Sequence, residues 1–149
     1  MELKKRYSFS SDVKNLEMIE AVSTQIMTDA GFNESCVDDI SIALTELVNN
    51  AIHHGNEDDE SKEVVVEFLI NDKKAMVSVE DQGKGFKPEA IQSPLDPNML
   101  MAENGRGIYL VKALMDAVEY KITDTGTRVS FSKIISAETM CSKDKNNDE

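Results

Sequence analysis

The sequence predicts an α+β fold, a two-layer sandwich in which helices cover one face of a mostly antiparallel, mixed sheet. Periodic segments follow the order strand, helix, helix, hairpin, long irregular segment, helix, hairpin. Each hairpin implies an antiparallel pair of strands, and each helical segment carries a single apolar stripe. Helices that are apolar on one side only can bury that side against a sheet, so both layers share one core.

The first two elements are a strand and a helix. Residues 4–9 alternate between apolar and polar side chains, which predicts a strand. A helix follows, with Ser10 or Ser11 as the expected N-terminal cap and Gly31 as the expected C-terminal cap. Its apolar residues recur at helical spacing: Leu16, Ile19, Val22 and Ile26.

A second amphipathic helix is expected to begin after Asn33 and to end at Gly55. Its apolar stripe consists of Ile40, Leu44, Leu47 and Ala51. Residues 56–60 are polar and mostly acidic, so they predict a loop.

The next segments predict a hairpin and a long loop. Strands over residues 63–70 and 74–81 are joined tightly by residues 71–72, as in an antiparallel hairpin. Residues 83–104 contain all three prolines and show no sustained periodicity. Because a loop this long inside a compact domain usually has a function, we expect this segment to be functional.

The last part of the chain predicts a helix and a second hairpin. Residues 106–117 return to helical periodicity, and strands over residues 118–123 and 127–134 follow. The sequence from residue 136 onward is polar and predicts disorder. We therefore expect one domain over residues 1–135 and a disordered tail over residues 136–149, because 149 residues suit a single domain.

The composition limits the class of partner. The chain has 28 acidic and 16 basic residues, and its formal net charge of −12 opposes nucleic acid and anionic membranes. It has no run of about twenty apolar residues and no apolar N-terminal segment, so we expect a cytoplasmic protein. Cys36 and Cys141 lack metal-ligand spacing and are expected to be reduced thiols. Proteins or small molecules are the expected partners.

The second helix carries a polar stripe beside its apolar one. Glu46, Asn50 and His54 are spaced four residues apart, and Asn49 and His53 lie beside them at the same pitch. A carboxylate and an amide one turn apart can bind a hydrated Mg²⁺ ion, or the carboxylate can accept a proton from a nucleophile. For this helix taken alone, a solvated face is the favoured interpretation of the stripe. The histidines lack partners for zinc, which favours a supporting role.

The strand over residues 74–81 ends in a carboxylate that faces inward. Alternation places Asp81 on the same face as apolar residues of that strand, so the carboxylate requires hydrogen-bond donors such as water or a purine amine. Gly83 and Gly85 follow, and glycine lets the backbone approach a flat base or a phosphate closely. A plain glycine turn after a strand is the alternative.

A further candidate site lies at the start of the last helix. Gly105 and Gly107 precede it, and free backbone N–H groups at a helix N-terminus attract phosphate. Arg106 or Lys112 could add positive charge. Thr127 shares a face with apolar residues of the last strand, so its hydroxyl either binds phosphate or simply flanks a turn.

Taken in order, residues 46–55, 81–86 and 105–111 resemble the N box and the two glycine boxes of the GHKL ATPase superfamily. The resemblance extends over roughly residues 35–133 and is far more specific than any single box. It implies a Bergerat-type ATP-binding fold with ATP and Mg²⁺ as ligands, and it implies that the long loop forms a lid over the phosphates.

The resemblance also implies a role for each residue. Glu46 corresponds to the general base, Asn50 to the Mg²⁺ ligand, and Asp81 to the carboxylate that reads adenine. The full set of residues expected to contact the nucleotide is Asn49, Asn50, His53, Asp81, Gly83, Gly85, Asn104, Gly105, Arg106, Gly107, Ile108 and Thr127.

Within the superfamily, the chain resembles the bacterial anti-sigma-factor serine/threonine kinases. The roughly 35 residues before the N box leave no room for a histidine-kinase dimerisation region, and no transducer domain is evident. The resemblance implies a kinase that phosphorylates a small antagonist protein of the anti-anti-sigma type. It also implies binding to a sigma factor and leaves room for a homodimer.

Two other functions remain open at this point. Glu103 and Asn104 stand where a lid arginine would be expected before Gly105, which leaves room for a protein that sequesters its partner without phosphorylating it. A detached catalytic domain of a histidine kinase is the other alternative.

Overall fold

The structure of the chain is a computed structural model that describes residues 2–83 and 105–141. Its helical elements are α1 (Asn15–Asp29), α2 (Glu34–Asn50), the π-helical turn η1 (Ala51–Gly55) and α4 (Gly105–Leu114). Its strands are β1 (Leu3–Ser10), β2 (Glu63–Ile70), β3 (Lys74–Glu80), β4 (Ala117–Ile122) and β5 (Thr127–Ile134). The expected lid loop lies outside the described residues from position 84 to position 104, and with it Gly85 and Asn104.

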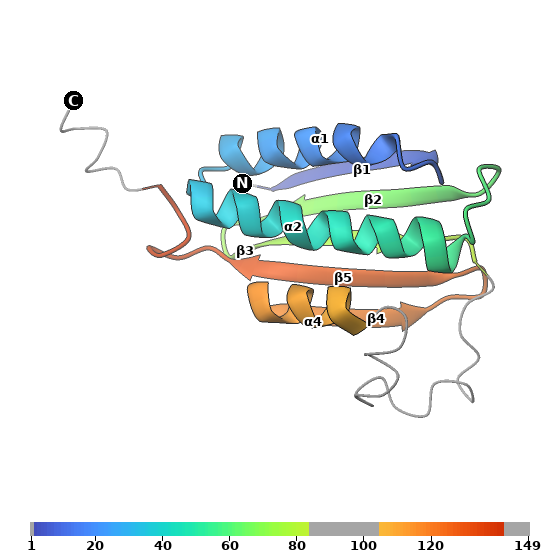
Figure 1. The fold of residues 1–149 in the computed structure, drawn as a ribbon. Coiled ribbons are helices and arrows are strands. Elements are labelled where there is room, and N and C mark those ends of the chain that lie inside the picture. Colours follow the sequence, from blue (N-terminus) through green and yellow to red (C-terminus); the bar gives the residue numbers. More distant parts are fainter. Residues whose placement is uncertain (1, 84–104, 142–149) are drawn as a thin grey trace.

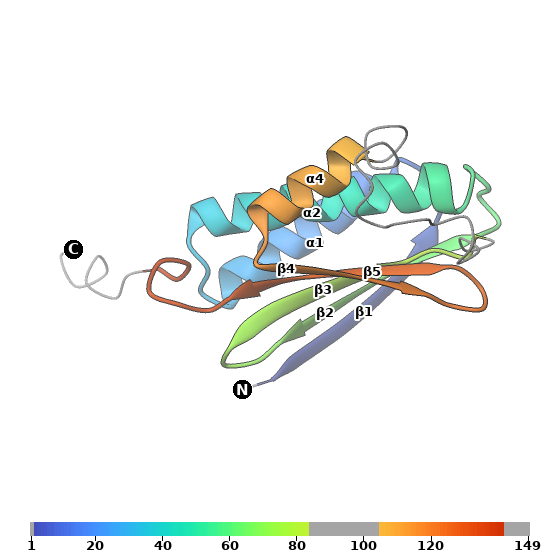
Figure 2. The same cartoon turned by 90° about the horizontal axis from the view of Figure 1, so that it is seen from below.

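The five strands form one sheet in the order β1-β2-β3-β5-β4. All pairings among the described strands are antiparallel, so the mixed component that we expected is absent from them. Among the described residues, helices α1, α2 and α4 lie on the same face of the sheet (Figures 1 and 2). The predicted α+β sandwich is therefore confirmed, with a sheet that is more regular than expected.

The core lies between the helices and the inner face of the sheet. Alternation along β2 and β3 sends every second side chain inward, which is the pattern of a sheet with one covered face. The most deeply buried side chains include Ile19, Met27, Ile40, Leu44, Val48, Val64, Val66, Phe68, Val77 and Phe131. The outer face carries polar groups such as Glu67 and Arg128, whose side chains approach to 3.5 Å.

The start of α1 differs from the prediction, whereas its end agrees with it. The helix begins at Asn15, and neither Ser10 nor Ser11 caps it. Ser11 is instead buried, and its hydroxyl donates a hydrogen bond to the carbonyl of Lys62 at 2.8 Å. Gly31 adopts a φ of 98°, a left-handed conformation that glycine accepts without strain.

Helix α2 begins as predicted and changes its pitch near its end. The Asn33 side chain accepts a hydrogen bond from the Cys36 backbone N–H at 2.9 Å, which makes it the N-terminal cap. At the other end, Asn56 N–H donates to the Ala51 carbonyl at 2.8 Å, an i→i+5 bond of the π turn η1. The helical segment still ends at Gly55, but its final turn is a π turn, which is wider than the α-helical turn that we expected.

The last helix ends sooner than expected because the chain enters the sheet. Helix α4 ends at Leu114 instead of residue 117, and Lys133 Nζ donates to the Leu114 carbonyl at 2.7 Å. Asp116 N–H then donates to the Ser132 carbonyl at 3.0 Å, so the backbone pairs with β5 from that point. Strands β1 to β5 each begin and end within about one residue of their predicted bounds.

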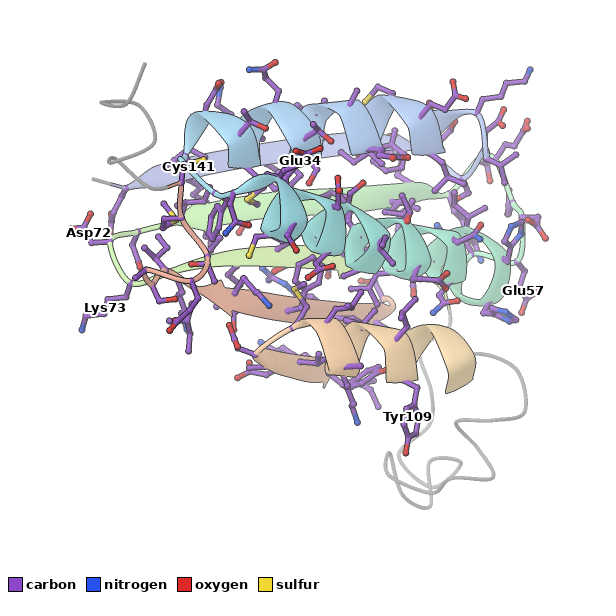
Figure 3. The ribbon with its side chains drawn as sticks, turned by 60° about the vertical axis from the view of Figure 1, so that its left-hand side comes forward. Glu34, Glu57, Asp72, Lys73, Tyr109 and Cys141 are labelled. Atoms are coloured by element: carbon purple, nitrogen blue, oxygen red, sulfur yellow. The ribbon has the colours of Figure 1, made fainter. Side chains whose placement is uncertain are left out.

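Residues 136–141 were expected to be disordered, and that expectation is wrong for this part of the tail. Asn33 N–H donates to the Thr139 carbonyl at 2.8 Å, and Cys141 N–H donates to the Gly31 carbonyl at 2.8 Å. Met140 packs against the core. This segment therefore covers the α1–α2 junction, beside the end of the molecule that carries the β2–β3 turn and opposite the end with Glu57 (Figure 3).

Three simpler expectations concern thiols and membranes. Cys36 and Cys141 are both free, and burial raises the pKa of the Cys36 thiol. A raised pKa suppresses the thiolate form, so the Cys36 thiol is a poor nucleophile. None of the helices in the described part of the chain is long and apolar enough to cross a membrane.

Replacing Asn33 by alanine tests the junction that it forms. Its side chain accepts from Cys36 N–H and donates to the Glu138 carbonyl, so Asn33→Ala loses a helix cap and a tie to residues 136–141. We expect the free energy of unfolding in urea to fall by about 1–2 kcal/mol. Ser35→Ala, an exposed change in the same helical turn, is the control. An unchanged unfolding midpoint for Asn33→Ala would contradict this account.

Candidate functional site

The site is centred on Asp81, which follows β3 at one end of the sheet. Its side chain is 8% exposed, and its Oδ1 accepts hydrogen bonds from the N–H groups of Gly83 at 3.0 Å and Thr127 at 3.1 Å. The inward orientation predicted by alternation is therefore confirmed. Its second oxygen, Oδ2, accepts no hydrogen bond from the described residues and lies against Gly55.

The environment of this carboxyl disfavours its charge. Burial raises the pKa of Asp81, and the two backbone hydrogen bonds from Gly83 and Thr127 counter only part of that effect. A buried carboxylate with a free oxygen is costly unless a donor reaches it. The site is therefore built to receive a hydrogen-bond donor from a ligand or from water.

Three glycines allow the backbone to surround Asp81. A Cβ at Gly55 would overlap the Asp81 carboxyl group, and a Cβ at Gly126 would overlap the Asp81 carbonyl oxygen. A Cβ at Gly83 would overlap the Gly55 carbonyl oxygen. Sequence reasoning placed Gly55 at a helix end and left Gly126 in the short connection between the last two strands, so it missed both as site residues. Only their three-dimensional proximity to Asp81 reveals why glycine is required.

A second cluster joins α2 to the start of α4. A Cβ at Gly107 would lie 2.6 Å from Glu46 Oε2 and 3.5 Å from Asn50 Nδ2. The four-residue spacing of Glu46 and Asn50 thus brings both side chains to the same point of α4, as the helical pitch predicts. Glycine at this position leaves room for them beside the backbone.

Asn50 contributes an unsatisfied polar group to this cluster. Its Nδ2 atom is buried and has no hydrogen-bond partner among the described residues. Buried amide groups are nearly always paired in folded proteins, so an orphan of this kind points to a missing ligand or water. Rotation of the amide about its last bond would present the oxygen instead of the nitrogen.

The N-terminus of α4 completes the site. The helix begins at Gly105, so the first N–H groups of its ten residues have no partner within the helix. Such a terminus attracts anions through these N–H groups and the helix dipole. The side chain of Arg106 is outside the described part of the structure, so its proposed charge contribution stays a prediction.

The remaining candidates occupy different positions. Thr127 is 6% exposed and contacts Asp81 through its backbone N–H. His53 is exposed, and its Nδ1 lies 2.5 Å from Asp58 Oδ1 in the loop after η1. Ile108 is buried in the core, and Asn49 is half-buried on α2. A hydrogen bond therefore joins Thr127 to Asp81, and Glu46 and Asn50 both approach Gly107. His53 instead pairs with Asp58 in the loop.

Asn56 is the residue that sequence reasoning missed most completely. It was expected in an acidic loop, yet it is fully buried and its side chain bonds to three separate segments. The only local signal is its place directly after Gly55, and that signal does not distinguish it from any other loop residue.

The donor set also limits what metal the site could hold. Among residues 2–83 and 105–141, no group of three or more His, Cys, Asp or Glu side chains could hold an ion. A cation here would need oxygen ligands from a bound phosphate and from water in addition to Asn50. Mg²⁺ is commonly held in this way, with few protein ligands and several waters, so the residues present fit it.

Solved structures share this fold. The chain superposes with a TM-score of 0.66 on the RsbU and RsbW domains of a Mycobacterium tuberculosis protein, at 18% identity over 89% of this chain and 32% of that one. A histidine kinase domain from Erythrobacter litoralis gives a TM-score of 0.54 at 19% identity, over 80% of this chain and 59% of that one. The chain thus spans about a third of the first and under two thirds of the second. These likenesses show that the chain shares its fold with RsbW and histidine kinase domains.

Sequence comparison assigns the family. Residues 9–133 match the histidine kinase-like ATPase domain, and the chain belongs to that family. It is 31% identical over 127 residues to the serine-protein kinase RsbW of Bacillus licheniformis, covering 81% of this chain and 79% of the relative. It is 32% identical over 116 residues to RsbW of Listeria monocytogenes, covering 74% and 73%. The resemblance to the anti-sigma-factor kinases is therefore confirmed at the level of the family.

The raised pKa of Asp81 predicts how stability varies with pH. In Asp81→Asn the side-chain oxygen still accepts from Gly83 and Thr127, but the buried charge is gone. A raised folded pKa means that the folded wild type binds more protons than the unfolded chain, so its stability falls as pH rises above about 4. We expect Asp81→Asn to gain stability relative to wild type over that range, measured by urea unfolding at several pH values.

Asp59 offers a control of the opposite sign. Hydrogen bonds from Ser61 lower the pKa of this exposed carboxyl group. The stabilising contribution of such a group is present above its unfolded pKa and is lost as pH falls, so Asp59→Asn should lose stability relative to wild type as pH rises. If the stability of wild type relative to Asp81→Asn instead increased with rising pH, that result would contradict the burial of the Asp81 charge.

Proposed function

We propose that this protein is a cytoplasmic, ATP-dependent kinase that phosphorylates a serine or threonine of a small antagonist protein and sequesters a sigma factor. The observation that carries the proposal is the arrangement of two half-sites, one around Asp81 and one around Glu46, Asn50 and Gly107. Their residue types suit the two ends of a nucleotide. Membership in the family of the RsbW serine-protein kinases supports the same reaction.

The Asp81 half-site suits adenine. Its free Oδ2 can accept a hydrogen bond from an exocyclic amine, while Oδ1 is already occupied by Gly83 and Thr127 N–H groups. Guanine carries a carbonyl oxygen at the corresponding position and would oppose the carboxylate. The glycines around Asp81 leave a backbone surface that a flat ring can approach.

The second half-site suits the phosphates. The N-terminus of α4 offers backbone donors to them, and the orphan amide of Asn50 lies beside Gly107. Mg²⁺ held there would neutralise charge on the phosphates. Asn50 would hold the ion through its side-chain oxygen, with the remaining ligands coming from water and phosphate.

In this proposal, Glu46 accepts the proton of the substrate hydroxyl. Its Oε2 approaches the same point of α4 as Asn50, so it lies where the phosphate end of the nucleotide is expected. In phosphoryl transfer to serine or threonine, a carboxylate in this position accepts the hydroxyl proton as the oxygen attacks the γ-phosphorus. The backbone donors of α4 would stabilise the charge that develops on the transferred group.

Replacing Glu46 by glutamine separates binding from chemistry. Glu46→Gln keeps the size of the side chain and removes its ability to accept the proton, so we expect phosphotransfer to fall by about 100-fold or more with ATP affinity nearly unchanged. Transfer of radiolabelled phosphate from ATP to a cognate antagonist measures the rate, and calorimetry measures affinity. Glu34→Gln, at the exposed start of the same helix, is the matched control.

Each other outcome points to a different function. A wild type that binds ATP but transfers nothing to any cognate antagonist would refute the kinase and favour a sequestering protein. Phosphate on the product that is labile to acid would indicate phosphohistidine, and hence a detached histidine-kinase domain.

A further inference from the structure

Asn56 is a fully buried polar residue directly after η1, and every hydrogen-bonding group of its side chain is used. Its Nδ2 donates to Ser11 Oγ at 2.6 Å and to the Glu63 carbonyl at 3.0 Å. Its Oδ1 accepts from Gln82 N–H at 2.7 Å. Both N–H donors and the oxygen of the amide are therefore engaged, and this pattern of two donations and one acceptance fixes the orientation of the side chain.

These bonds tie together the ends of three strands. Ser11 follows β1, Glu63 begins β2, and Gln82 comes two residues after the end of β3. Two further bonds close the network, since Ser11 Oγ donates to the Lys62 carbonyl at 2.8 Å and Glu63 N–H donates to Gln82 Oε1 at 2.7 Å. One buried side chain therefore fixes the end of η1 to the sheet at the end where the site lies.

The network reaches Asp81 by two routes. Gln82 is the residue between Asp81 and Gly83, and its backbone N–H is the group that Asn56 binds. Gly55, the neighbour of Asn56, lies against the Asp81 carboxyl group and presents its carbonyl oxygen to Gly83. A shift of Asn56 would thus move both the backbone that carries Asp81 and the wall that the carboxyl group packs against.

The second half-site does not depend on these contacts in the same way. Glu46 and Asn50 lie on the regular part of α2, before the π turn, and they meet Gly107 of α4. Asn56 makes none of its side-chain hydrogen bonds with those elements in the described structure. Its influence is therefore directed to the Asp81 end of the site.

We propose that Asn56 is a positioning residue for base recognition: it orients Asp81, and thereby sets the preference of the site for adenine over guanine. The proposal rests on the proposed function, because it assigns Asp81 to the base. Asn56 touches no ligand in this account. It acts by fixing Gln82 and Gly55 on the two sides of the carboxyl group.

The test compares Asn56→Ala with Asn33→Ala. Asn33 also makes side-chain bonds to the backbone of two segments, but at the opposite end of α2, so its loss controls for general destabilisation. Affinities for ATP and GTP are measured by calorimetry under conditions in which both variants are folded. We expect Asn56→Ala to bind ATP about tenfold more weakly and to lose most of its preference over GTP, with Asn33→Ala unchanged.

A second readout does not involve nucleotide. Carboxyl NMR titration should show the pKa of Asp81 falling toward its ordinary value in Asn56→Ala, because a loosened carboxyl group gains water, and staying raised in Asn33→Ala. If Asn56→Ala does not fold, Ser11→Ala removes one partner of the amide and should shift both readouts in the same direction by a smaller amount.

The outcomes separate the two claims. A folded Asn56→Ala with wild-type Asp81 titration and wild-type preference for ATP would overturn the positioning role. So would an altered titration without any change in base preference. A wild type that binds no ATP would refute the proposed function itself, and with it the assignment of Asp81 to a base, whatever the titration shows.

Discussion

The buried carboxyl group of Asp81 is the constraint on which this site depends. A carboxylate at the end of a strand, facing the core, is costly unless its oxygens are hydrogen-bonded. The protein supplies two backbone donors to Oδ1 and leaves Oδ2 facing Gly55. This arrangement explains the glycines at positions 55, 83 and 126, because a Cβ at any of them would overlap Asp81 or the backbone beside it.

The same constraint links the fold to the chemistry. The antiparallel pairing of β3 with β5 brings Thr127 beside Asp81, and the turn before β5 needs a glycine to pass the Asp81 carbonyl. Helix α2 lies over the same sheet and continues through η1 to Gly55, next to the carboxyl group. Asn50 is the last residue of α2, and Glu46 lies one turn before it. One helical segment thus connects the half-site around Asp81 with the half-site around Glu46, Asn50 and Gly107.

Local periodicity predicted those parts of the site that regular elements position. Alternation placed Asp81 inward, and helical pitch aligned Glu46 with Asn50. What it missed depends on contacts between distant segments. His53 in the π turn pairs with Asp58, Asn56 bonds to the ends of three strands, and residues 136–141 bond to the α1–α2 junction. Polar residues in such places have the same local sequence signature as solvated loops.

The central claim is that base and phosphates occupy the two half-sites of a single pocket. A crystal structure of the protein with Mg²⁺ and a non-hydrolysable ATP analogue tests it most directly. The account predicts the adenine amine at Asp81 Oδ2, the phosphates at the N-terminus of α4, and the ion at the side-chain oxygen of Asn50. A nucleotide bound elsewhere, or one whose base makes no contact with Asp81, would contradict it.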